Sequence, residues 1–241
     1  MKKSILFYIS FYAILLISLQ AEAFRLAPMT VNFVTDGEGS TQLFRVENAA
    51  NDRIAVKIQA FIRQIDEEGK EQLIPTTDFR IFPEQLSLAA SDSRAIRIIY
   101  IGKKELDYEL AYRIVATQLP VSFKENTPKA GLNFLFQFVA SAYVTNHKFF
   151  PKIEMESFTH TDQDTFKLKI INKGQKHILL KNVIVELTDL SGKSLKINSD
   201  SVSTWASENI LPGSRRILTV KSQSQFDVNK SKTRIEIRDV P

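Results

Sequence analysis

Three histidines and a pair of adjacent acids are the residues in this chain that could support catalysis or metal binding. His147, His160 and His177 are far apart in the sequence, there is no cysteine, and each histidine lies beside polar or turn residues. Zinc ligands recur at short spacings, and no zinc signature or glycine-rich phosphate loop is present. Glu67 and Glu68 fall in a predicted turn, where hydration explains both charges. The sequence therefore predicts three surface histidines, no enzyme, no metal site and no cofactor.

Large apolar side chains are concentrated between Leu132 and Val144. In an extended strand, residues at every second position share one face, and four large ones do so here: Leu132, Phe134, Phe136 and Phe138. The opposite face is also apolar, with Leu135, Val139 and Tyr143. Two interpretations remain open. The segment is either a central strand buried on both faces or a strand that offers its side chains to another protein.

The first 23 residues have the composition of a secretory signal peptide. Lys2 and Lys3 precede an apolar run from Ile5 to Leu19, and Ala21-Glu22-Ala23 supplies the small residues of a cleavage site. Cleavage removes two lysines and one glutamate, so the formal net charge of +5 becomes +4. The remaining basic residues are scattered among acids, which argues against a nucleic-acid site. An exported chain without cysteine favours a bacterial periplasm.

Strand patterns follow one another after the leader, with polar turns between them. The expected strands of the first part are residues 26–33, 42–48, 54–62, 79–88, 95–101, 110–119 and 132–144. Pro83 interrupts the fourth, because proline has no amide hydrogen to donate to a neighbouring strand. This number of strands in about 120 residues is typical of an immunoglobulin-like sandwich.

A second domain is expected after the pattern breaks near Thr145 to Pro151. Further strands are expected at residues 165–171, 178–187, 194–197, 216–220 and 233–238. Turns are expected at Ser191-Gly192 and Pro212-Gly213. The predicted organisation is all-β: a signal peptide (1–23), an immunoglobulin-like domain (24–146) and a C-terminal β-sandwich (147–241).

Several segments together resemble one family of proteins. They are Leu43 to Asn48, Asp78 to Pro83, Arg94 to Tyr100, Glu109 to Arg113 with Leu119-Pro120, and Leu211 to Arg215. Their order and spacing resemble the PapD-like periplasmic chaperones, which assemble pili and fimbriae by the chaperone-usher route. The resemblance extends over nearly the whole mature chain and is that of a divergent branch.

The resemblance implies two immunoglobulin-like domains set at an angle, and a strand that completes the sandwich of a pilus subunit by β-augmentation. In this chain that donor strand is residues 131–144, with Leu132, Phe134, Phe136 and Phe138 as subunit-binding side chains. The implied partners are pilus or fimbrial subunits and an outer-membrane usher. Self-association of the free protein, which would shield the phenylalanines, is left open.

One departure from the family concerns the subunit's terminal carboxylate. Many members bind it with an arginine on the first strand and a lysine on the seventh, and the matching positions here are Met29 or Thr30 and Ser141. None of these is basic. The candidates for a relocated anchor are three arginines: Arg97, Arg113 and Arg25. The alternatives are that these arginines make ordinary surface pairs, or that the carboxylate stays hydrated.

A rival interpretation is a secreted two-domain adhesin or carbohydrate-binding protein. Such a protein would use its loops or Trp205 in place of a strand, since tryptophan can stack on a sugar. Packing inside the second domain is the more ordinary role for Trp205.

Overall fold

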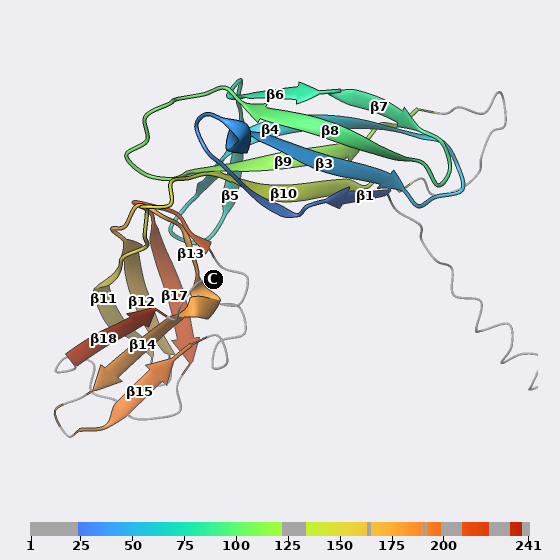
Figure 1. Cartoon of the computed structure of the whole chain (residues 1–241). Coiled ribbons are helices and arrows are strands. Elements are labelled where there is room, and N and C mark those ends of the chain that lie inside the picture. The colour runs from blue at the N-terminus through green and yellow to red at the C-terminus, as the bar shows by residue number, and fades with distance from the viewer. Residues whose placement is uncertain are drawn as a thin grey trace, which may run out of the picture.

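The structure is a computed structural model that describes residues 24–121, 134–162, 165–188, 190, 192–198, 209–221 and 232–237. The predicted leader, Leu132 and Trp205 lie outside these residues. In the described part of the chain, strands are accompanied only by two short 3-10 helices, η1 (Glu38–Ser40) and η2 (Leu180–Asn182). No helix in this part is long and apolar enough to cross a bilayer. Strands β1 to β10 form one body and β11 to β18 a second, set at an angle to the first (Figure 1).

The N-terminal body is a sandwich of two sheets. The first sheet has the order β1 (Phe24–Ala27), β3 (Thr41–Asn48), β8 (Ser93–Tyr100) and β6 (Phe79–Phe82). The second has the order β2 (Thr30–Phe33), β10 (Gln137–Val144), β9 (Leu110–Gln118), β4 (Ile54–Ile65) and β5 (Glu71–Pro75), and β7 (Gln85–Leu88) also pairs with β4. All pairs are antiparallel except β2 with β10, which is parallel.

The first predicted strand is divided between the two sheets. We expected a single strand over residues 26–33, but β1 pairs with β3 in one sheet and β2 pairs with β10 in the other. The division falls at Pro28, which has no amide hydrogen for a ladder. Pro83 divides the predicted strand 79–88 into β6 and β7 in the same way. Strand β5 was not expected from the sequence.

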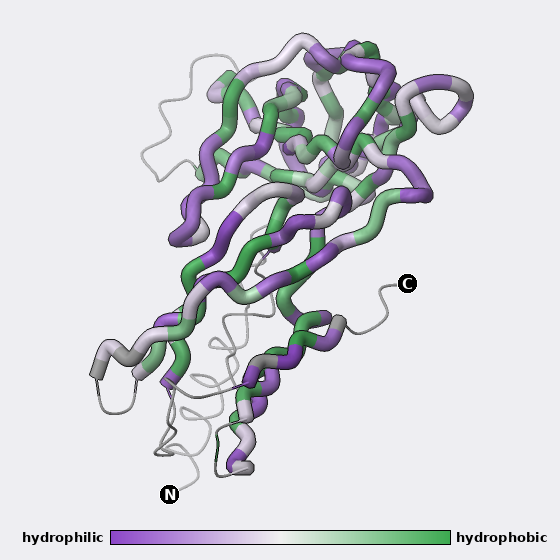
Figure 2. The backbone as a smooth tube through the Cα atoms, turned by 90° about the vertical axis from the view of Figure 1, so that its left-hand side faces the viewer, coloured by the Kyte–Doolittle hydropathy of each residue, from purple (hydrophilic) through white to green (hydrophobic). Residues whose placement is uncertain are grey.

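Alternating side chains place the core between these sheets. In β3, Phe44 and Val46 are buried while Leu43 and Arg45 are exposed, and the hydrophobic and hydrophilic residues alternate along the strands (Figure 2). The buried cluster draws on strands of both sheets and includes Phe33, Val56, Ile58, Leu88, Ile96, Ile98 and Ile114. Burial of each such side chain contributes about 1.5–3 kcal/mol, so this apolar interior holds the sandwich together without disulfides.

The C-terminal body has its own apolar cluster and three small sheets. Their orders are β11 (Ile153–Asp162), β12 (Thr165–Asn172), β17 (Arg215–Lys221); β13 (Ile178–Leu179), β16 (Asn209–Ile210); and β15 (Ser194–Ile197), β14 (Val183–Thr188), β18 (Lys232–Ile237). The expected strand 178–187 is broken by η2 into β13 and β14, and β11 was not expected. The proposed domain division at residue 146 falls in the connection between β10 and β11.

Candidate functional site

Strand β10 has an edge that is only partly paired. One side of β10 pairs with β9 along its whole length, from Gln137 to Val144. The other side pairs with β2 only from Ser141 onward, where Ser141 lies opposite Thr30. Within the part of the chain that the structure describes, no strand pairs with this second side before Ser141. The first half of β10 therefore presents backbone donors and acceptors that a strand from another chain could satisfy.

The predicted donor side chains differ in their surroundings. Phe134 precedes β10 and is 69% exposed, and its neighbour Leu135 is 52% exposed. Phe136 and Phe138 are half-buried and pack against the core of their own sandwich. The ring of Phe138 meets that of Phe24 edge-on, with centroids 4.8 Å apart. Phe134 is thus accessible to another protein, whereas Phe136 and Phe138 contact the core of their own sandwich and remain partly exposed.

The three candidate anchor arginines lie in different places. Arg113 projects from β9 and lies directly opposite Ser141 of β10. Arg97 is exposed on β8, in the other sheet, where its cross-strand partners are Leu43 and Phe82. Arg25 is exposed on β1, opposite Glu47. Only Arg113 adjoins the position at which the family resemblance expects a lysine.

Arg113 belongs to a network of two arginines that share one carboxylate. Its Nε and Nη2 donate to Oε1 and Oε2 of Glu71 at 2.8 and 2.7 Å, and its Nη1 donates to Oγ of Ser141. Arg63, on β4, donates from its Nε to Oε2 of the same Glu71 at 2.8 Å. Burial opposes ionisation of Glu71, but the hydrogen bonds and charges of both arginines outweigh it and lower the pKa of this carboxyl group. Glu71 is therefore ionised at neutral pH.

The network continues into the C-terminal body through Tyr143. The Tyr143 hydroxyl accepts hydrogen bonds from Nη1 of Arg63 at 3.3 Å and from Nδ2 of Asn209 at 2.7 Å. The Tyr143 ring stacks on the imidazole of His177, with centroids 3.8 Å apart and planes 6° from parallel. His177 Nδ1 contacts Oε1 of the buried Glu109, which also accepts from the His177 amide at 3.0 Å. One aromatic side chain thus joins the arginine network to the other body.

The β4–β5 hairpin supplies further contacts between the two bodies. The Ile217 amide donates to the carbonyl of Glu67 at 2.7 Å, and the Glu67 carboxylate pairs with Lys169 at 2.7 Å. The buried Arg216 donates to the carbonyls of Asp66 at 2.6 Å and of Asn209 at 2.7 Å. The same hairpin carries Arg63 and Glu71, so the arginine network and the junction of the bodies share one element.

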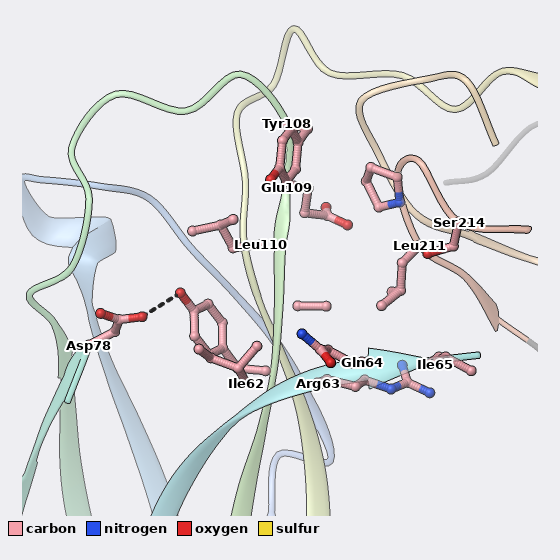
Figure 3. A pocket seen from close by; sticks show the side chains of 13 residues that line it. Ile62, Arg63, Gln64, Ile65, Asp78, Tyr108, Glu109, Leu110, Leu211 and Ser214 are labelled. Carbon is pink, nitrogen blue, oxygen red and sulfur yellow. Dashed lines mark hydrogen bonds between the residues drawn. The ribbon is translucent and has the colours of Figure 1, made fainter. Parts of the chain in front are cut away.

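A pocket lies where the two bodies meet (Figure 3). It has a volume of about 580 Å³ and is lined by the end of β4, the start of β9 and the turn from Leu211 to Ser214. Asp78 accepts a 2.8 Å hydrogen bond from the Tyr112 hydroxyl at one side of it. Burial, together with this bond, raises the pKa of Tyr112, so the phenol stays protonated. The lining combines apolar side chains such as Ile62 and Leu211 with polar ones such as Arg63 and Ser214.

The sequence predictions for the polar residues need one correction. His147 is exposed as expected, and the side chain of His160 lies outside the description, but His177 is packed against Tyr143. Among the described residues, no group of three or more histidines or acids is arranged to hold a metal ion. From the sequence, no role was expected for Arg63 or Glu71, and Tyr143 was expected only as an apolar residue of the strand 132–144. The one sequence signal for Arg63 was the alternation of apolar residues in β4. It places residue 63 on the face of the sheet that points away from the core of the sandwich.

Replacing Tyr143 with phenylalanine is expected to destabilise the protein by about 1–3 kcal/mol, because the buried Asn209 amide loses its acceptor. Urea denaturation measures this loss, and Tyr108→Phe is a matched control because Tyr108 is half-exposed at 51%. Equal stabilities of the two variants would contradict the importance assigned to the Tyr143 hydroxyl.

Residues 25–140 match the family described as pili and flagellar-assembly chaperone, PapD N-terminal domain. This part of the chain belongs to that family. The matched residues thus include nearly all of β1 and the first half of β10. The match ends just before Ser141, the first residue of β10 that pairs with β2. The family and the fold are those of non-enzymatic chaperones. No curated protein matches the chain.

Solved structures extend the likeness of fold beyond the PapD N-terminal domain to both bodies. The Class 5 fimbriae chaperone CfaA has a TM-score of 0.58 at 14% identity, covering 91% of this chain and 100% of its own. The SafB chaperone, solved in complex with the Salmonella enterica SafA pilin, has 0.53 at 15%, covering 91% and 98%. The CsuC–CsuE chaperone–tip adhesion subunit complex of Acinetobacter baumannii gives 0.52 at 14%, covering 85% and 91%. The chain is therefore all-β, with two immunoglobulin-like sandwiches set at an angle, and divergent in sequence.

Proposed function

We propose that this protein is a periplasmic chaperone that binds, folds and caps pilus or fimbrial subunits by donor-strand complementation. The observation that carries the proposal is the open half-edge of β10 beside the exposed Phe134 and Leu135. An incomplete subunit sandwich has unpaired strand edges and an unfilled groove, both of which promote aggregation. A strand with a free edge and large apolar side chains corrects both defects.

The donated surface would combine free and half-buried side chains. Leu132 and Phe134 would enter the subunit's groove. Phe136 and Phe138 are half-buried in the chaperone's own sandwich, and their exposed parts would cover the rest of the groove. Each fully buried side chain would contribute about 1.5–3 kcal/mol, before the costs of association and ordering. Moderate net affinity suits a chaperone, because the subunit must later leave for the growing pilus.

The geometry also favours one direction for the subunit strand. If its terminal carboxylate meets Arg113 beside Ser141, the strand before it must run along the open half of β10 toward Ser141. It is then parallel to β10 and ends where β2, itself parallel to β10, begins at Thr30. Arg113, on the neighbouring strand β9, would take the role of the lysine that the family has at the position of Ser141. This supports a relocated anchor. Arg97 and Arg25, in the other sheet, would not reach this carboxylate.

The proposed chaperone would act after export and deliver its subunits to an outer-membrane usher. Co-expression with a pilin-like subunit that lacks its last strand tests the proposal. Native mass spectrometry of periplasmic extracts should show a one-to-one complex, and omission of the chaperone should lead to loss of the subunit. Recovery of the subunit without the chaperone would contradict the proposal. Glycan binding by the chain alone would instead support an adhesin.

A further inference from the structure

We propose that Glu71 is a built-in competitor for the carboxylate of the bound subunit and occupies Arg113 until the subunit arrives. This inference rests on the proposed function and concerns the regulation of its anchor. Both oxygens of Glu71 accept from Arg113, through Nε at 2.8 Å and Nη2 at 2.7 Å. This two-bond geometry is the one in which a guanidinium group binds any carboxylate, including a chain terminus. The edge of Arg113 that would take the subunit is therefore already filled.

The charges of the network leave room for one more anion. Arg63 and Arg113 carry two positive charges, and Glu71 supplies one negative charge. Among the described residues, the hydrogen bonds and ion pairs of these arginines reach no second carboxylate. The residues on either side of Arg113 in adjacent strands are the neutral Phe61 and Ser141. A single terminal carboxylate would thus balance the group, and a neutral peptide end would not.

Glu71 has a second partner, Arg63, with which it can stay paired when the subunit binds Arg113. Its Oε2 also accepts from Nε of Arg63 at 2.8 Å, so losing Arg113 leaves Glu71 paired. Arg63 is the most buried of the three, with 8% of its side chain exposed, against 17% for Arg113 and 27% for Glu71. Arg63 is therefore the fixed partner, while Arg113 and Glu71 lie closer to solvent and to an incoming chain.

This exchange would help the subunit to leave as well as to bind. When the subunit's carboxylate departs, Glu71 can pair with Arg113 again, so a partly buried guanidinium is not left without an anion. An uncompensated buried charge is costly, and avoiding it lowers the barrier to release. Glu71 thereby limits affinity and speeds hand-over.

The test uses a peptide of alternating valine and threonine that ends in tyrosine, made with a free carboxylate and as the carboxamide. In Glu71→Gln the carboxylate peptide should bind about tenfold more tightly than in the wild type, because Arg113 is no longer occupied for most of the time. The carboxamide should bind both proteins equally. Adding Arg113→Ala to Glu71→Gln should remove the gain.

Glu154→Gln is the matched control. Glu154 is likewise shared by two cations, Lys152 at 2.9 Å and Lys173 at 2.6 Å, but it lies in the C-terminal body, so its loss should not change peptide affinity. If Glu71→Gln binds the carboxylate peptide no more tightly than the wild type, or not at all, the competitor role is wrong. Subunit capture in the periplasm is measured separately, and its success in that case would leave the proposed function intact.

A second measurement needs no variant. The Nε–Hε resonance of Arg113 in the wild-type protein should shift when the carboxylate peptide is added and stay in place with the carboxamide. An unchanged resonance with both peptides would overturn the inference even if Glu71→Gln did not fold.

Discussion

Replacing Arg113 with alanine is expected to weaken subunit capture by about 2–5 kcal/mol, roughly 30-fold or more in the dissociation constant. The variant would leave the subunit's terminal carboxylate partly buried and without a cation. The chaperone itself should remain folded, because Glu71 keeps its pair with Arg63. The measurement is the affinity for a purified subunit, together with the thermal midpoint of each variant.

Arg97→Ala is the comparison that makes this result specific. It removes the same charge from the outer face of the other sheet, where Arg97 is exposed between Leu43 and Phe82. Subunit affinity should be unchanged in this variant. Equal losses from both substitutions would show that general positive charge, and not a defined anchor, attracts the subunit. An unfolded Arg113→Ala protein would assign Arg113 a structural role.

The sandwich could be predicted because its signals are local. Alternation of apolar and polar residues in β3, β4, β8 and β9 is visible within each segment, and prolines mark where strands must change sheets or stop. Two of the strands that were missed, β5 and β11, lack this clarity. In β5 no residue is buried, so Glu71 to Pro75 alternates only weakly, and pairing with the strongly patterned β4 determines its place.

The candidate site was less predictable because its contacts are distant in sequence. Arg113 lies 42 residues from Glu71, and Arg63 lies 80 residues from Tyr143. No spacing rule connects such residues, and only the order of strands in the sheet brings them to one face. The prediction that His177 is a surface residue failed for the same reason. Its partners, Tyr143 and Glu109, belong to the other body.

The β4–β5 hairpin carries both the arginine network and contacts to the C-terminal body, which the sequence did not predict. It carries Arg63 and Glu71 on its strands and contacts Lys169 and Ile217 of the C-terminal body through its turn. A change in how Glu71 is paired therefore occurs on the element that also joins the two sandwiches.

Replacing Phe134 with serine should weaken subunit binding by about 1.5–3 kcal/mol, or roughly 10- to 150-fold, because one large side chain no longer fills the subunit's groove. Phe134 is 69% exposed, so the stability of the free chaperone should be unchanged. Adding Phe136→Ser should weaken binding further and also lower stability, since Phe136 packs against the chaperone's own core.

Phe82→Ser separates this effect from a general loss of apolar surface. Phe82 is 75% exposed on the opposite sheet and has no place on the open edge of β10, so its replacement should leave binary subunit affinity intact. Native mass spectrometry and isothermal titration against one purified subunit would compare the variants. If Phe134→Ser captures the subunit as well as Phe82→Ser does, the strand before Ser141 is not donated, and the open edge of β10 must serve another purpose.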